Sequence, residues 1–350
     1  MLVESSPEQS AEPQAAAQPR GRRSLRAAGL LLSLGVLVLV CVASIVVGAK
    51  PVPLGDVWHG LFQNSGTGND VLIADVRVPR TLLGLLAGVA LGLAGAVMQA
   101  LTRNPLAEPG LMGVNAGAAA AVVTATSVLG ATSFMGYVWF AFVGAAVVSV
   151  LVYVLGGGRT ATPVRLALAG TAATAALYGY VNAVQLLDSA ALDRLRFWTV
   201  GSLAGADADV VAAVAPFIAA GVVLAALVAR PLNAMEMGDD TARALGANLT
   251  RTRVLAMLAV TLLCGGATAA CGPIVFVGLM VPYLVRAITG PDMRWILPYA
   301  AVLSPVLLLG SDIVGRVVAR PSELQVGIVT ALIGGPVFIH LVRRKRMAQL

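Results

Sequence analysis

Residues 81–101 read TLLGLLAGVALGLAGAVMQAL, a run of 21 residues without a charged side chain. At 1.5 Å per residue, an α-helix of this length covers about 30 Å, which is the thickness of the hydrocarbon core of a bilayer. A strand of a membrane barrel would instead alternate apolar and polar residues over about ten positions. The run therefore indicates a membrane-spanning α-helix.

Comparable runs recur along the chain, and together they predict an all-α polytopic membrane protein with about ten transmembrane helices. The eighth run is short and starts at Gly272-Pro273, so we expect it to be tilted or not to cross fully. The predicted helices are approximately 27–48, 81–101, 111–130, 135–155, 164–187, 209–229, 254–271, 273–289, 295–313 and 325–342.

The composition agrees with this class. Of the 350 residues, 58% are hydrophobic and 12% are charged, whereas a soluble domain has about 45–50% and about 25%. So little charge nearly excludes a water-soluble enzyme, and no catalytic residue is predicted. His59 and His340 are isolated and the three cysteines lie in apolar runs, so we expect neither a metal site nor a cofactor.

The distribution of basic residues predicts the orientation. With ten spans and a cytoplasmic N-terminus, most Lys and Arg residues fall on the cytoplasmic side, which favours two cytoplasmic termini. This bias explains the net charge of +7 without a nucleic-acid partner. Residues 1–26, rich in Ala, Pro, Gln and Ser, are expected to be a disordered cytoplasmic tail, and residues 27–345 the membrane domain.

The sequence shows no sign of an ATPase or of an ion-coupling site within the chain. No G-x-x-x-x-G-K-[ST] phosphate loop occurs, and the glycine cluster at 156–160 lacks the lysine and the spacing. No carboxylate lies in the middle of the first eight runs, where an ion-coupled transporter would place one, and Asp312 lies near a span end. The energy for any transport is therefore expected from a separate subunit.

Two features of the second run have more than one interpretation. Gly84, Gly88, Gly92 and Ala96 recur every four residues, a pattern that favours close helix packing, although such a stripe can also line a pathway. Gln99 follows on an apolar stretch, and residues 103–105 (Arg-Asn-Pro) end the helix. This polar segment is either an interfacial turn or the lining of a water-filled cavity.

The connection at about 230–253 contains the segment 237–248, which reads MGDDTARALGAN. Asp239 is predicted to cap a short helix that Gly246 ends. Ala242, Leu245 and Leu249 form a narrow apolar stripe on it. A helix this short gains stability by docking into a partner's groove, although a solvated connector would fit the composition equally well.

Several arginines are predicted on the outer side, against the positive-inside bias. Arg77 and Arg80 precede the second span, and Arg316 and Arg320 precede the last one. They either form salt bridges with a partner or extend to the phosphates of the lipid.

In their order along the chain, over about residues 70–345, the motifs resemble those of the FecCD-type permease family of ABC importers, which carries iron–siderophore, haem and vitamin B12 complexes. No single motif is specific, but the ordered set is. The matching stretches are RVPRTL at 77–82, Gln99 with RNPLAEPG at 103–110, FW at 197–198, GSL at 201–203, RPLN at 230–233, residues 238–246, GPIVFVGL at 272–279 and VGIVTA at 326–331.

The resemblance implies a transmembrane permease subunit without enzymatic activity, with the BtuC-like type II importer fold. It also implies a multi-pass location in the bacterial cytoplasmic membrane. The implied partners are two ABC ATPase subunits, an extracytoplasmic substrate-binding protein and a second permease, identical or similar. By the same resemblance Arg77, Arg80 and Arg316 receive glutamates of the binding protein, and a family motif places Gln99, Asn104 and Pro105 near the cytoplasmic end of the second span. The residues that couple to the ATPase are Gly238, Asp239, Asp240, Ala242, Leu245 and Gly246.

The sequence of residues 316–327, RVVARPSELQVG, resembles that of ferric-siderophore members of the family more than that of vitamin B12 members. Tyr283 departs from the family pattern, where many members have histidine. The expected function is therefore the uptake of ferric-siderophore complexes. The alternatives are a vitamin B12 or haem permease of the same family and, in another class, an ion-coupled secondary transporter.

Overall fold

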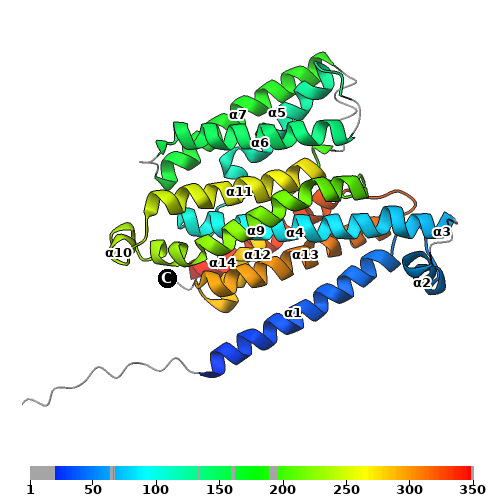
Figure 1. Cartoon of the computed structure of the whole chain (residues 1–350), viewed down its shortest axis with the longest axis horizontal. Helices are drawn as coiled ribbons and strands as arrows, with labels where there is room; N and C mark the ends of the chain where they lie inside the picture. The colour runs from blue at the N-terminus through cyan, green and yellow to red at the C-terminus, as the bar shows by residue number, and fades with distance from the viewer. Residues whose placement is uncertain are drawn as a thin grey trace, which may run out of the picture.

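The computed structural model describes residues 20–63, 66, 68–131, 134–158, 162–188, 196 and 198–347. In these residues all regular structure is helical (Figure 1). The elements are α1 (Arg20–Val46), α2 (Leu54–Phe62), α3 (Gly68–Val71), the π-helix η1 (Leu72–Arg77), α4 (Val78–Thr102), the 3-10 helix η2 (Pro109–Met112), α5 (Val114–Ser127), α6 (Phe134–Leu155), α7 (Pro163–Leu187), α9 (Ala208–Glu236), α10 (Asp239–Ala244), α11 (Leu249–Cys271), α12 (Val277–Thr289), α13 (Met293–Val318) and α14 (Val326–Met347).

Each of the ten predicted runs coincides with a helix, and the all-α polytopic prediction is confirmed. Among the described residues, six helices are long and apolar enough to cross a membrane by length and composition, and three apolar helices are shorter. The predicted tail, residues 1–26, lies mostly outside the described residues. Its last part is helical, because α1 begins at Arg20.

The connection between the first two predicted runs, residues 49–80, contains short helices. It holds α2, and then α3 and η1, which continue directly into α4. A small apolar cluster of Val52, Val57 and Ile73 holds this segment together. Val52 precedes α2, Val57 lies in α2 and Ile73 in η1, so no single periodicity in the sequence reveals them.

The loop predicted at 230–253 is shorter in the structure. α9 continues through Pro231 to Glu236, and α11 begins at Leu249. Leu232 and Met235 are fully buried, and their packing outweighs the hydrogen bond that the proline removes.

The eighth predicted span is the short helix α12, with 13 residues. At 1.5 Å per residue it covers about 20 Å, less than the hydrocarbon core. The preceding segment from Gly272 is not helical. Gly272 has φ +72°, and a Cβ there would collide with the carbonyl oxygen of Trp198. The close approach of the two backbones therefore requires glycine at this position.

α4 lies at the centre of the molecule, against α9, α11, α12 and α13 (Figure 1). Its glycine stripe serves packing: a Cβ at Gly88 would stand 2.5 Å from the Cα of Pro305 in α13, and Gly84 and Gly92 face the same helix. α5, α6 and α7 lie together on one side, where α6 packs on α11, and α1 rests on α13 at the other edge. Because α4 has about 37 Å of length, it joins the two ends of the molecule.

Candidate functional site

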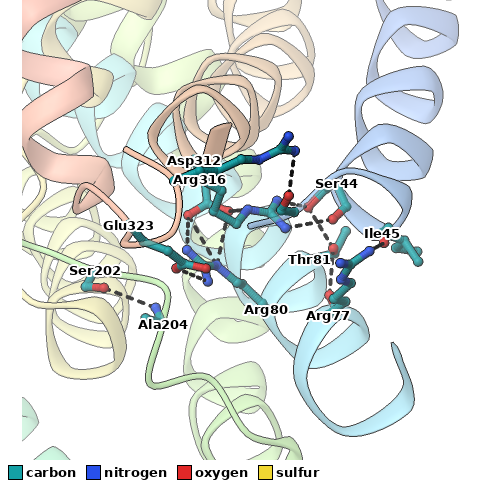
Figure 2. Close-up of polar contacts among 12 residues, drawn as sticks. Ser44, Ile45, Arg77, Arg80, Thr81, Ser202, Ala204, Asp312, Arg316 and Glu323 are labelled. Carbon is teal, nitrogen blue, oxygen red and sulfur yellow. Dashed lines mark hydrogen bonds and ion pairs between the residues drawn. The ribbon is translucent and has the colours of Figure 1, made fainter. Parts of the chain in front are cut away.

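Polar side chains gather at both ends of α4. At its beginning, Arg77, Arg80 and Arg316 lie with Ser44, Asp312 and Glu323, and we call these six residues the arginine cluster (Figure 2). At its other end, Arg103 lies with Glu236, Asp239, Arg253 and Arg286, and we call these five residues the α10 corner.

Arg77 closes the end of α1. Its Nη1 donates to the carbonyl oxygens of Ile45 and Val46, each at 2.8 Å, and its Nη2 donates to that of Lys50 at 2.5 Å. The last carbonyls of a helix have no partner within the helix, so this guanidinium satisfies groups that α1 leaves open. Arg77 is 4% exposed, and its side chain is turned into the subunit.

Arg80 is the centre of two ion pairs. Its Nη2 lies 2.8 Å from Oδ1 of Asp312, and its Nε donates to Oδ2 of the same carboxylate at 3.1 Å. Its Nη1 lies 2.7 Å from Oε2 of Glu323. The Asp312 side chain is fully buried, whereas that of Glu323 is 33% exposed. The cluster therefore has a closed interior and one carboxylate at its rim.

Arg316 completes the cluster from α13. Its Nε forms an ion pair with Oδ2 of Asp312 at 3.0 Å, although the orientation is not that of a hydrogen bond. Its two terminal nitrogens donate to the carbonyl and the hydroxyl oxygen of Ser44, each at 3.0 Å. Ser44 in turn shares a hydrogen bond with Thr81. These contacts tie α1, α4 and α13 together.

The structure thus brings the three predicted docking arginines into one cluster, and it gives each of them partners within the chain (Figure 2). Their role in docking stays a prediction. Asp312 and Glu323 are the residues that sequence reasoning did not assign to this site. The spacing of Asp312 and Arg316, one helical turn apart, was the available signal.

α10 has the predicted position but a different start. Its N-cap residue is Gly238, with φ +111°, so the prediction that Asp239 caps the helix is wrong. Asp239 is the first helical residue instead, and its side chain turns to neighbouring helices. Gly246 ends the helix with φ +81°, as predicted. The amides of Gly246 and Ala247 donate to the carbonyls of Arg243 and Ala242, the arrangement of a Schellman motif.

Asp239 joins α10 to two other elements. One carboxylate oxygen accepts from Arg103, directly after α4, and the other accepts from Arg253 of α11 at 2.8 Å. Partial burial raises the pKa of the Asp239 carboxyl, but its hydrogen bonds and the charges of the two arginines outweigh this effect, so the pKa lies below its ordinary value. The carboxylate is therefore held in its charged form.

The predicted apolar stripe of α10 divides between two environments. Ala242 is fully buried and Leu249 is 6% exposed, so both pack into the subunit. Leu245 is 63% exposed and Met237 59%. Asp240 is almost fully exposed and, within the described part of the chain, forms an ion pair with Arg243 three residues later. α10 thus fixes one face to its own chain and presents another outward.

The motif near the end of α4 lines a cavity of about 290 Å³, together with Arg103, Glu236 and Arg286. Gln99 is 2% exposed and donates to the carbonyl of Leu279 in α12 at 2.9 Å, while its own side-chain oxygen is buried and has no hydrogen-bond partner among the described residues. Pro105 lies on the wall of the cavity. The structure therefore supports the interpretation of this polar segment as the lining of a cavity.

The remaining motif residue, Asn104, shapes the chain where α4 ends. Its side-chain oxygen accepts from the amide of Leu106 at 2.9 Å. Near it, Arg286 of α12 pairs with Glu236 of α9 at 2.5 Å. In the α10 corner, α10 is therefore in polar contact with the end of α4 and with α11, and α9 is in polar contact with α12.

The comparisons with known proteins decide the family. The model of the FecCD transport family matches residues 36–344. The chain belongs to the FecCD transport family. This chain is 46% identical to the ferric enterobactin transport system permease protein FepD of Escherichia coli (strain K12). The match covers 92% of this chain and 96% of FepD. The chain is also 38% identical over 86% of its length to the probable siderophore transport system permease protein YfiZ of Bacillus subtilis (strain 168), with 91% of that protein covered.

A solved structure supports the same assignment. It is an inward-facing transporter assigned to the metal-chelate type of ABC transporters, with a TM-score of 0.78 and 26% identity. The match covers 91% of this FecCD chain and 99% of that one. The protein is thus a multi-pass membrane permease of an ABC importer.

Proposed function

We propose that this FecCD protein is the permease subunit through which a bacterial importer moves ferric-siderophore complexes across the cytoplasmic membrane. The observation that carries the proposal is the 46% identity, over nearly the whole length of both chains, to a ferric enterobactin permease. A hemin permease of Yersinia pestis is 35% identical, which makes haem the less favoured cargo. A ferric siderophore arrives with its iron already coordinated, so the permease needs a cavity that opens alternately and no metal ligands of its own.

The proposed assembly has two permease subunits, two ATPases and an extracytoplasmic binding protein. The positive-inside bias favours cytoplasmic termini, which places α10 in the cytoplasm with the ATPase and the arginine cluster on the outer side. α10 and the arginine cluster lie at opposite ends of α4 (Figure 1), so each partner would meet a different end of one central helix.

We propose that α10 couples the permease to its ATPase. The exposed side chains of Met237, Asp240 and Leu245 would seat in a groove of the ATPase, because a short helix with exposed apolar side chains can bind in a partner's groove. On the other face, Asp239 would carry the motion of α10 to Arg103 and Arg253. ATP binding would thereby move the ends of α4 and α11 together.

We propose that the binding protein docks at the rim of the arginine cluster. Glu323 already occupies one edge of the Arg80 guanidinium, and it is the more exposed of its two carboxylate partners. A glutamate of the binding protein would take its place. Arg77 and Arg316 would act indirectly, because they hold α1 and α13 in the position that exposes this rim.

The test is uptake into proteoliposomes that contain the permease, its ATPase and its binding protein. Iron-loaded catecholate, hydroxamate and citrate chelates, hemin and cobalamin are offered in parallel, with and without ATP. The proposal predicts ATP-dependent accumulation of a ferric siderophore. Faster uptake of hemin or cobalamin would contradict the cargo, and uptake driven by a proton or sodium gradient without ATP would contradict the class of transporter.

A further inference from the structure

A pocket of about 360 Å³ lies between the first turns of α1 and the beginning of α13. In Figure 1, the first turns of α1 lie toward the same end of the molecule as α10. Neither the coupling nor the docking proposal uses it. Its lining residues are Arg23, Arg26, Asp292, Arg294, Trp295 and Pro298.

The charge of this pocket is not balanced. Within the part of the chain that the structure describes, none of its three arginines forms an ion pair, in contrast to Arg80 and Arg316 at the other end of the molecule. The only carboxylate in the lining, Asp292, is engaged elsewhere. It caps α13 through the amide of Arg294 at 3.0 Å and accepts from the Asn233 side chain at 2.7 Å. Among the described lining residues, three arginines therefore face one carboxylate, and the pocket has an excess of positive charge.

Two helix beginnings add to this positive potential. α1 and α13 both start at the pocket, and neither has an acidic residue in its first turn. The N-terminal end of a helix carries a partial positive charge, so arginines placed there are unfavourable unless an anion accompanies them. Arg23 and Arg26 lie within the first two turns of α1. The Asp292 carboxylate already caps α13, so an anion in the pocket would chiefly offset the charges of Arg23, Arg26 and Arg294.

The walls of the pocket are held in place. The Tyr299 hydroxyl donates to the carbonyl oxygen of Arg26 at 2.6 Å, which fastens the beginning of α1 to α13. The Arg26 guanidinium lies 5.9 Å from the centre of the Trp295 ring, within the range of a cation–π contact. Trp295 is thus both a wall of the pocket and a side chain typical of the membrane interface.

The neighbourhood of the pocket indicates a lipid and not a soluble anion. Along α1, directly beyond the arginines, large apolar side chains point away from the protein. Leu31 and Leu32 are 70% and 72% exposed, and Leu39 is 69% exposed. Acyl chains would lie along this face while the headgroup reached the arginines. Basic pockets between helices at the cytoplasmic surface are a known setting for anionic headgroups.

We propose that this pocket binds the phosphate of an anionic glycerophospholipid. Arg23, Arg26 and Arg294 surround the headgroup, Trp295 lies at the interface, and the exposed face of α1 holds the acyl chains. The lipid fills the space between α1 and α13 and balances the positive charge that exceeds that of Asp292.

The test measures which lipid stays with the purified protein. The full-length permease is placed in nanodiscs with equal amounts of phosphatidylglycerol and phosphatidylcholine, and native mass spectrometry counts the lipids that remain bound. Wild-type protein is expected to retain phosphatidylglycerol at least tenfold over phosphatidylcholine, with a preference that falls as salt rises. The triple variant Arg23→Gln, Arg26→Gln, Arg294→Gln is expected to lose this preference.

The matched control removes three exposed arginines that do not line the pocket, Arg165→Gln, Arg230→Gln and Arg251→Gln. It should retain the lipid as the wild type does. Equal retention by the triple variant and the wild type, or an equal loss in the control, would overturn the proposal. Displacement of the lipid by millimolar inorganic phosphate would overturn it in favour of a soluble anion. If the triple variant does not fold, the single variant Arg294→Gln, at an exposed position, must lower the preference several-fold.

Discussion

Both ends of α4 hold ion pairs between arginines and an aspartate, but the pairs at one end are buried and those at the other are partly exposed. In the arginine cluster the shared carboxylate of Asp312 is fully buried and its arginines are 8% and 2% exposed. In the α10 corner the shared carboxylate of Asp239 is 33% exposed, and Arg103 is 38% exposed. Buried ion pairs fix helices in one arrangement, because the loss of one partner leaves a charge without solvent. Exposed pairs exchange with water at little cost, so this end is suited to move against a partner.

The largest expected effect is on stability, at the buried end. Asp312→Ala leaves both Arg80 and Arg316 without their shared carboxylate. We expect a loss of about 3–5 kcal/mol of unfolding free energy, measured by thermal unfolding in detergent. Asp75→Ala, at an exposed position of η1, is the control and should change little. A loss below about 1 kcal/mol for Asp312→Ala would remove the difference between the two ends.

At the α10 end the largest effect should be on transport and not on stability. Leu245→Asp places a charge on the exposed face that we assign to the ATPase, and because Leu245 is 63% exposed, little packing is lost. We expect ATP-dependent uptake to fall at least tenfold while thermal unfolding is unchanged. Leu245→Met keeps an apolar side chain and should preserve uptake. Normal uptake and ATPase assembly in Leu245→Asp would contradict the role of α10.

Asp239 and Asp240 form a matched pair of neighbouring carboxylates. Asp239→Asn weakens the contacts of α10 with Arg103 and Arg253, whereas Asp240→Asn affects only the pair with Arg243 within α10. We expect Asp239→Asn to lower the ratio of uptake to ATP hydrolysis several-fold, and Asp240→Asn to leave it near that of the wild type. Equal ratios of uptake to ATP hydrolysis in both variants would show that Asp239 does not transmit the motion of α10.

A smaller effect is expected on docking of the binding protein. Glu323→Gln removes the charge that competes for Arg80 at the rim of the cluster. The association rate of the binding protein, measured on permease in nanodiscs, should rise about twofold to threefold and depend more steeply on salt. Asp75→Asn removes a charge at the same end outside the cluster and is the control. An unchanged or slower association in Glu323→Gln would oppose docking at this rim.

The smallest effect concerns pH. Because the native pKa of Asp239 lies below its ordinary value, its ion pairs stabilise the folded protein above the ordinary aspartate pKa, about 3.9. This contribution is lost as the pH falls through that value to the lowered native pKa. The difference in unfolding free energy between wild type and Asp239→Asn should be a few tenths of a kcal/mol at pH 6 and shrink below pH 4. A difference that grows as the pH falls would contradict the assigned sign.

The two ends also differ in what the sequence could predict. The ten apolar runs gave the helices, because long runs without charge have few alternatives in a membrane. The arginines at the start of α4 were recognised as unusual, and the one-turn spacing of Asp312 and Arg316 was a local signal of their contact. The sequence offered no sign that Asp312 and Glu323 pair with Arg80, since these contacts join residues more than 230 positions apart. At α10, the sequence of residues 237–248 predicted a short helix that ends at Gly246. The sequence did not predict that Asp239 contacts neighbouring arginines while Leu245 stays exposed, because helical spacing alone does not say which face of a helix is covered.

The central claim is that this permease is moved by an ATPase acting on the α10 end. The most direct test compares proteoliposomes that hold the purified permease alone with proteoliposomes that also hold the ATPase and the binding protein, each supplied with ATP and a radioactive ferric siderophore. We predict accumulation in the complete system and none with the permease alone. Sustained accumulation by the permease alone would contradict the account.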